Sequence, residues 1–331
     1  MSYPDTLDDL VPTTENIRYA PHLPTRMEFY ENAESQDGGN AALVFIHGGS
    51  WSGNDRTLFR VHGANGYDLC AYALQSGLTT NKWNVFSIDY RMSAYTGVNP
   101  SSYPSLYPDG FNDTACAVQF IKDNAASFGI NPSKVVLFGS SAGGTNALHT
   151  AFRRSQPYFA KTSPAMPRRF AYRSSSSVAA VVNFIGPIDF RYDEEEGTET
   201  WTYNHNTAGW SGLFGHSLTD SGAEWSSAEM DAVKEAASPL AYIEMPVLEQ
   251  RPSGVYSVYN ATSPTGKPYA NLHASEQAAI LHAALDAAGV DNDYEVITSG
   301  AWEDYTPSPT VQDSPSYMIS GRVMTFIEDL L

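Results

Sequence analysis

The sequence predicts an α/β protein in which a mostly parallel sheet of about eight strands carries helices on both faces. Apolar stretches of strand length alternate with helical stretches along most of the chain. This alternation is typical of parallel strands joined by right-handed crossovers. Two glycine-rich turns, at residues 47–51 and 139–143, each follow directly on an apolar stretch and strengthen the prediction.

The expected elements begin near residue 26 and continue to residue 330. Residues 1–15 are polar and rich in Pro and Asp, which predicts an arm rather than a packed element. Residues 189–235 form a polar insertion rich in aromatic side chains. The strands are expected at residues 26–31, 41–46, 85–89, 134–138, 178–184, 254–259 and 294–298, and the helices at 110–127, 143–154, 274–288 and 315–330.

Length and charge bound the class of protein. The 331 residues are 42% hydrophobic, enough for a large core, and the order of the motifs over nearly the whole chain favours one domain. The formal net charge of -18 argues against nucleic acid and anionic membranes as partners. The first residues resemble no signal peptide, and no apolar stretch approaches a membrane span, so we expect a soluble, cytoplasmic protein.

Residues 139–143 read Gly-Ser-Ser-Ala-Gly and stand between the apolar run 135–138 and a helical stretch. This Gly-x-Ser-x-Gly pattern predicts a sharp strand-to-helix turn that exposes the hydroxyl of Ser141 above the sheet. Glycine is needed at both ends, because a Cβ on Gly139 or Gly143 would collide with the neighbouring strand or helix. The pattern makes Ser141 a candidate nucleophile.

Residues 47–51, His-Gly-Gly-Ser-Trp, form a second glycine-rich turn at the end of the apolar stretch 41–46. Such a turn can aim backbone N–H groups at an oxyanion beside the serine hydroxyl. Two parts of a serine hydrolase are therefore present. The candidate oxyanion donors are the N–H groups of Gly48, Gly49, Ser50 and Ala142.

Together the two motifs resemble the α/β-hydrolase esterases, in particular the hormone-sensitive-lipase and kynurenine-formamidase branches with their HGGxW or HGGG signature. Residues 89–91 (Asp-Tyr-Arg), 129–144 and 237–240 follow the same family, so the resemblance covers about residues 15 to 331. It implies a three-layer α/β-hydrolase fold and hydrolysis of small carboxylic esters or amides. It also implies that residues 189–235 form a small cap over the active site.

The sequence departs from the family where the other members of a catalytic triad are expected. The family order is Ser, then Asp or Glu after the seventh strand, then His after the eighth. The family's acid aligns with Ser263 here, and its His aligns with Glu303. No His follows His282 in the sequence. Both standard partners of Ser141 are therefore missing from their usual positions.

Three accounts of this site are open. In the first, Glu303, with Asp304 beside it, accepts the Ser141 proton, which suits acidic conditions. In the second, His273 from the loop after the seventh strand acts as the base instead of merely starting a helix. In the third, the site is inactive, and the aromatic cap and acidic surface bind a partner protein or a glycan.

The remaining histidines and aromatic residues are assigned by their positions. We expect Trp51, Ser140 and Trp302 to line the substrate site. His47 is expected to stabilise its own turn. We expect His149 and His282 to be packed structural residues.

Neither a disulfide nor a metal site is expected. Cys70 and Cys116 should lie on helices that the family places on opposite faces of the sheet, too far apart to be joined. No group of His, Cys and Asp residues has the spacing of metal ligands, so we expect no metal and no cofactor.

Overall fold

The computed structural model describes residues 10–20, 25–34, 39–60, 67–74, 79, 81–92, 107–152, 174–191, 213, 227–245, 250–260, 275–297 and 315–331. Its strands are β1 (Thr14–Ile17), β2 (Met27–Tyr30), β3 (Asn40–Ile46), β4 (Trp83–Ile88), β5 (Ile130–Ser140), β6 (Ala180–Phe184), β7 (Gly254–Asn260) and β8 (Asp291–Ile297). Its helices are α1 (Tyr67–Leu74), α2 (Asp109–Asp123), α3 (Ala142–Ala151), α5 (Ser227–Ala237), α6 (Pro239–Ile243), α7 (Ser275–Ala288) and α8 (Pro315–Leu330), with short 3-10 helices η1 (Leu58–Arg60) and η3 (Ala125–Phe128).

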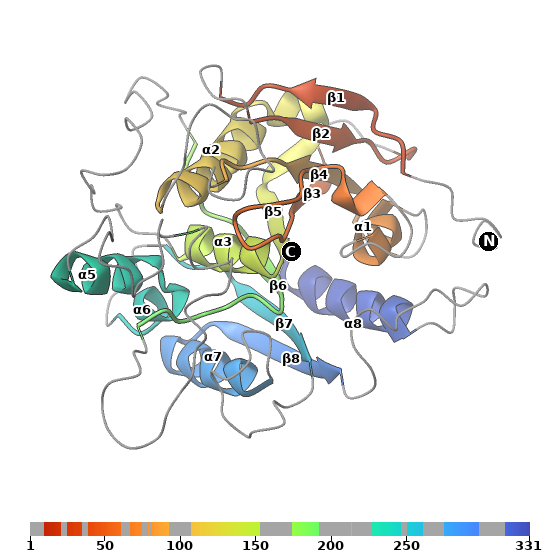
Figure 1. Cartoon of the computed structure of the whole chain (residues 1–331). Helices are drawn as coiled ribbons and strands as arrows, with labels where there is room; N and C mark the ends of the chain where they lie inside the picture. The colour runs from red at the N-terminus through yellow and green to blue at the C-terminus, as the bar shows by residue number, and fades with distance from the viewer. Residues whose placement is uncertain are drawn as a thin grey trace.

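The strands form one sheet of eight in the order β1-β2-β4-β3-β5-β6-β7-β8 (Figure 1). β2 pairs antiparallel with β1 and with β4, whereas every neighbouring pair from β4 to β8 is parallel. The predicted fold class, a mostly parallel sheet of about eight strands, is confirmed.

Helices cover both faces of this sheet, so the architecture has three layers (Figure 1). α2, α3, α5, α6 and α7 contribute to one hydrophobic cluster, and α1 and α8 contribute to another. β3 supplies both clusters, because side chains alternate across a strand: Val44 faces the first cluster, and Leu43 and Phe45 face the second. Cys70 and Cys116 are buried in different clusters, on opposite faces of the sheet, as predicted.

Several boundaries differ from the sequence prediction; β5, for example, begins at Ile130 rather than 134. β1 begins at Thr14, inside the expected arm, because its Thr-Glu-Asn-Ile sequence is mostly exposed and gives no hydrophobic pattern. β8 begins at Asp291 rather than 294, because it is an edge strand whose first residues are polar and largely exposed. Most of the expected cap, residues 192–212 and 214–226, lies outside the described residues.

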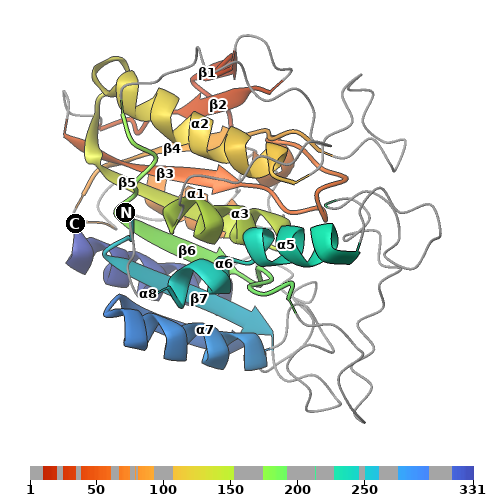
Figure 2. The same cartoon turned by 90° about the vertical axis from the view of Figure 1, so that its left-hand side faces the viewer.

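The topology brings the two glycine-rich turns together. β3 and β5 are neighbours, and Ile46 at the end of β3 pairs with Gly139 near the end of β5. Residues 47–51 and 139–143 therefore lie at the same carboxyl edge of the sheet. The arrowheads of β6 and β7 point toward this edge, where α5 also lies (Figure 2).

Candidate active site

Ser141 lies at the turn between β5 and α3, and its backbone is strained. Its φ of 50° and ψ of -119° are unusual for a residue with a Cβ. Two main-chain hydrogen bonds hold this conformation. The Ser141 N–H donates to the carbonyl of Phe184 at 2.8 Å, and the Ser141 carbonyl accepts the N–H of Thr145 at 3.2 Å. Ser141 is half-buried and lies at the strand-to-helix turn that the motif predicted.

Close backbone contacts explain the glycines of this turn. A Cβ on Gly139 would lie 2.1 Å from the carbonyl oxygen of Gly143. A Cβ on Gly143 would lie 2.0 Å from the carbonyl oxygen of Ile46 on β3. Both distances are far inside van der Waals contact, so the turn closes against β3 only when both positions are glycine.

The second turn, residues 47–51, also contains left-handed backbone. The φ angles of Gly49, Ser50 and Trp51 are 113°, 54° and 54°. The turn closes on itself, because the N–H groups of Ser52 and Gly53 both donate to the carbonyl of Gly49, at 2.9 and 3.0 Å.

Gly48 brings the second turn against the first. A Cβ on Gly48 would lie 2.9 Å from the carbonyl oxygen of Ser140 and 3.3 Å from the Cβ of Ser141. The two turns are thus in direct contact. An oxyanion hole beside a serine nucleophile requires this proximity.

His47 is fully buried, and its ring stacks on Tyr90 with 4.4 Å between ring centroids. Burial lowers the pKa of His47, so the imidazole is neutral at pH 7. Its Nδ1 lies 2.7 Å from the carbonyl oxygen of Gly48, and the tautomer that carries the proton on Nδ1 donates this hydrogen bond. His47 therefore stabilises its own turn, as the sequence predicted.

Trp51 and Ser140 face inward. Trp51 is only 6% exposed, its ring packs beside Phe111 and Phe190, and its Nε1 donates to Asn146 Oδ1 at 2.9 Å. The Oγ of Ser140 is buried and has no hydrogen-bond partner within the described residues. Their assignment to the substrate site stays a prediction. Asn146 was not singled out by the sequence, because no motif marks it.

The candidate bases Glu303 and His273 lie outside the described residues. Trp302, a predicted substrate-site residue, and Ser263, at the family's acid position, also lie outside them.

Two further histidines have structural partners, as predicted. His149 is fully buried with its Nε2 3.0 Å from the carbonyl oxygen of Ala236. His282 is 5% exposed, and its Nδ1 contacts Asn292 Oδ1.

A buried charge cluster lies next to the site, at the start of α2. The Nε and Nη2 of Arg91 donate to Asp113 at 2.9 and 3.0 Å, and Nη1 lies 3.1 Å from Asp109. All three side chains are buried. Burial raises the pKa of Asp109 to about 7; Arg91 opposes this shift and Asp113 adds to it.

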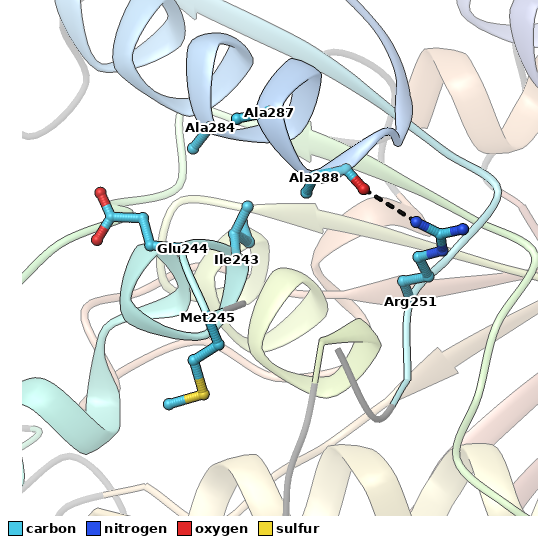
Figure 3. A pocket seen from close by; sticks show the side chains of 7 residues that line it. All are labelled: Ile243, Glu244, Met245, Arg251, Ala284, Ala287 and Ala288. Atoms are coloured by element: carbon cyan, nitrogen blue, oxygen red, sulfur yellow. Dashed lines mark hydrogen bonds between the residues drawn. The ribbon is translucent and has the colours of Figure 1, made fainter. Parts of the chain in front are cut away.

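A pocket of about 530 Å³ lies between α6 and α7 (Figure 3). It lies at the amino ends of the parallel strands, because Arg251 precedes β7 and Ala288 ends α7 just before β8. Ser141, in contrast, follows the carboxyl end of β5. This pocket therefore does not belong to the Ser141 site. Its lining residues are Ile243, Glu244, Met245, Arg251, Ala284, Ala287 and Ala288.

Within the described residues, no group of three or more His, Cys, Asp and Glu side chains could hold a metal ion. In the same part of the chain, no helix has the length and apolar character needed to cross a bilayer.

The chain is similar in sequence to known hydrolases. The profile of the BD-FAE family matches residues 27–248, which include both turns but not the candidate bases. Lipase 2 of Moraxella sp. is 32% identical over 127 residues, 38% of this chain and 25% of that protein. Carboxylesterase NlhH of Mycobacterium tuberculosis is 32% identical over 102 residues, 31% of this chain and 26% of that protein. The chain thus spans about a quarter of the length of these curated relatives.

Solved structures share the whole fold. A truncated form of a carbohydrate esterase from gut microbiota has a TM-score of 0.65 at 18% identity and covers 98% of this chain and 99% of its own. The butyrate-bound thermophilic esterase Est2 of Thermogutta terrifontis has a TM-score of 0.63 at 16% identity, with coverage of 96% and 93%. At these identities the likeness establishes the fold.

Proposed function

The chain belongs to the BD-FAE family, and from this premise we propose that it is a carboxylic-ester hydrolase of the serine type with Ser141 as its nucleophile. One observation carries the proposal: the strained turn of Ser141 lies in direct contact with Gly48 of the second glycine-rich turn. A hydroxyl at such a turn is presented to a substrate, and a neighbouring N–H can stabilise the charge that develops on the attacked carbonyl.

The proposed oxyanion donors are the N–H groups of Gly48, Gly49, Ser50 and Ala142. Gly48, Gly49 and Ser50 bring their N–H groups to the carboxyl edge of β3. Ala142 is the first residue of α3, and an N–H in the first turn of a helix has no partner within that helix. The helix dipole favours negative charge at the same place. In the proposed mechanism these groups stabilise the tetrahedral intermediate formed when Ser141 attacks the ester.

The proposed base is unorthodox. Serine needs a base within hydrogen-bond reach, and the sequence offers Glu303 or His273 in the loops after β8 and β7. A carboxylate stays ionised well below neutral pH, whereas an imidazole is protonated below about pH 6.5. The two candidates therefore predict different pH profiles.

A small ester is the proposed substrate. The named relatives are a lipase and a carboxylesterase, and one structural neighbour is an esterase with butyrate bound. The same esterase has also been phosphonylated by sarin, so an organophosphorus probe suits a test of Ser141. We expect short activated esters to be cleaved, and amides more slowly.

The first test is covalent labelling together with esterase activity. A fluorophosphonate probe should label wild type at Ser141, and Ser141→Ala should abolish both labelling and the hydrolysis of p-nitrophenyl acetate. Ser320→Ala, a buried serine on α8, is the matched control and should keep both. Equal hydrolysis by wild type and Ser141→Ala, with no labelling, would favour the alternative of an inactive fold that binds a protein or a glycan.

The second test separates the two bases. With Glu303 as base, only Glu303→Gln lowers kcat, and activity persists into acidic solution. With His273 as base, only His273→Ala lowers kcat, and wild-type activity falls below about pH 6.5. If both variants keep wild-type activity, the assignment of the base is wrong while the role of Ser141 stands.

A further inference from the structure

The turn at residues 47–51 contains strained backbone that must be stabilised by other contacts. Ser50 and Trp51 are consecutive residues with a φ of 54°, and neither is glycine. Left-handed backbone is unfavourable for any residue with a Cβ and persists only where the surroundings hold it. The proposed oxyanion donors lie in this segment, so whatever holds it also places them.

The indole of Trp51 anchors this segment. Its ring centroid lies 6.2 Å from that of Phe111 in a stacked arrangement and 6.0 Å from that of Phe190, edge to face. Its only N–H donates to Asn146 Oδ1 at 2.9 Å, and both side chains are buried. A buried indole N–H requires such a partner.

Asn146 is fixed at its other end as well. It is fully buried in the second turn of α3, and its Nδ2 donates to Thr114 Oγ1 on α2 at 3.5 Å. The Thr114 hydroxyl donates in turn to the carbonyl of Gly110 at 3.1 Å. Asn146 thus connects the turn at residues 47–51 to two helices, one of which begins directly after Ser141.

We propose that Asn146 is a positioning residue: through Trp51 it fixes the oxyanion donors relative to Ser141. Asn146 itself does not touch the reacting atoms. This inference rests on the proposed function of Ser141. Both glycine-rich turns take their position from α3. Ser141 directly precedes the first residue of this helix, and the Trp51 indole is hydrogen-bonded to Asn146 within it.

The expected kinetic signature follows from this geometry. Donors displaced by a fraction of an ångström stabilise the transition state less, while binding of the substrate before reaction changes little. Loss of the Trp51–Asn146 hydrogen bond should therefore lower kcat and leave KM unchanged. If the hydrogen bond had a purely structural role, its loss would lower the amount of folded protein but would not lower kcat at an unchanged KM.

Three variants test the inference: Trp51→Phe, which keeps an aromatic ring, Asn146→Leu, and the double variant. We expect each single change to lower kcat about 10- to 100-fold. Asn146→Leu, which keeps the indole in place, should leave KM within about twofold. The double variant should be no slower than the slower single variant, because both remove the same hydrogen bond. If Asn146→Leu does not fold, Trp51→Phe alone carries the kinetic test.

Trp83→Phe is the matched control. Trp83 is also fully buried, and its Nε1 lies 3.3 Å from Glu328 Oε1. It is the first residue of β4 and so lies at the amino end of this strand, away from the two glycine-rich turns. We expect this change to lower stability and to leave kcat within about twofold of wild type. A loss of kcat in Trp51→Phe no greater than in Trp83→Phe overturns the inference.

Amide hydrogen exchange separates this inference from the proposed function. Trp51→Phe and Asn146→Leu should speed exchange at residues 48–52 more than at residues 139–145. If wild type has no esterase activity but this local change occurs, the anchoring stands and the proposed function fails. If wild type is an esterase and neither exchange nor kcat changes in the variants, the anchoring fails and the proposed function stands.

Discussion

The two turns at the carboxyl edge of the sheet hold strained backbone in different ways. In the turn around Ser141, main chain packs on main chain: Gly143 lies so close to Ile46 on β3 that a Cβ would be 2.0 Å from its carbonyl oxygen. In the turn at residues 47–51, the main-chain hydrogen bonds to the Gly49 carbonyl are supplemented by side chains, namely the Trp51 indole and the His47 imidazole. The first turn is fixed by main-chain contacts that only glycine allows, and the second depends in addition on side-chain contacts.

This difference predicts two kinds of damage. A main chain packed against main chain has no side chain that can move aside, so a misfit there must disturb the sheet itself. A turn held by side chains can shift by small amounts when one contact is lost. Substitution of a glycine in the first turn should therefore impair folding. Substitution of a side chain that holds the second turn should instead shift the backbone of residues 47–51.

The largest expected effect is that of Gly143→Ala. The new Cβ would meet the carbonyl of Ile46 at 2.0 Å, so we expect a loss of more than about 4 kcal/mol in the free energy of unfolding, or no folded protein. Gly53→Ala, beside the second turn, is the control: the nearest atom to its new Cβ is 3.9 Å away, and its expected effect is below about 1 kcal/mol. Urea unfolding measures both, and similar losses would contradict the comparison.

The same contrast explains how much of the fold the sequence predicted. β3 is buried on both faces and reads as a continuous apolar run, so it was found close to its observed position. Of β5, only the buried apolar part from Val135 onward was found, and its less apolar beginning at residues 130–133 was missed. β1 was missed, because an exposed edge strand carries no such run. The predicted layers and the pairing of the two turns then follow from the order of the strands.

The site was predicted only where the requirement is local. The turn of Ser141 needs glycines at fixed positions, and a sequence shows these directly. The hydrogen bond between Trp51 and Asn146 joins residues 95 positions apart, and only the packing of α3 against β3 and β5 brings them together. Glu303 and His273 stay predictions, because their reach depends on how the loops after β8 and β7 fold.

A change at Asp109 tests the stability of α2, the helix that packs beside the second turn. Asp109 begins α2, which also carries Phe111 beside the Trp51 indole. Its folded pKa of about 7 lies above its unfolded value, so its contribution to stability is complete below about pH 4 and is lost as pH rises through 7. Asp109→Asn should therefore gain stability over wild type between pH 5 and pH 8, by at most about 4 kcal/mol.

Urea unfolding at several pH values measures this difference. Asp123→Asn removes an exposed carboxylate at the other end of α2, one that accepts the N–H of Ser174, and serves as the control for loss of a charge from this helix. Parallel curves for wild type and Asp109→Asn would show that Asp109 keeps an ordinary pKa in the folded protein.

The smallest expected effect concerns His47, whose hydrogen bond acts only within the second turn. Burial lowers its folded pKa below the unfolded value of about 6.5, so the folded protein binds the proton less readily than the unfolded chain. Its contribution to stability is complete above about pH 6.5 and is lost as pH falls from there through the folded pKa, by at most about 1.4 kcal/mol per pH unit. His47→Asn keeps a donor for the Gly48 carbonyl and should flatten this acid-side slope.

His282 supplies the matched control for this last test. Burial lowers its pKa too, so His282→Asn should also flatten the acid-side slope of stability. The two variants should differ in local exchange. Between pH 6.5 and 5, wild type should lose protection at residues 48–52 faster than at residues 139–145, and only His47→Asn should remove that difference. If His282→Asn removes it equally, acid acts on the whole fold, and the second turn is no more dependent on its side chains than the first.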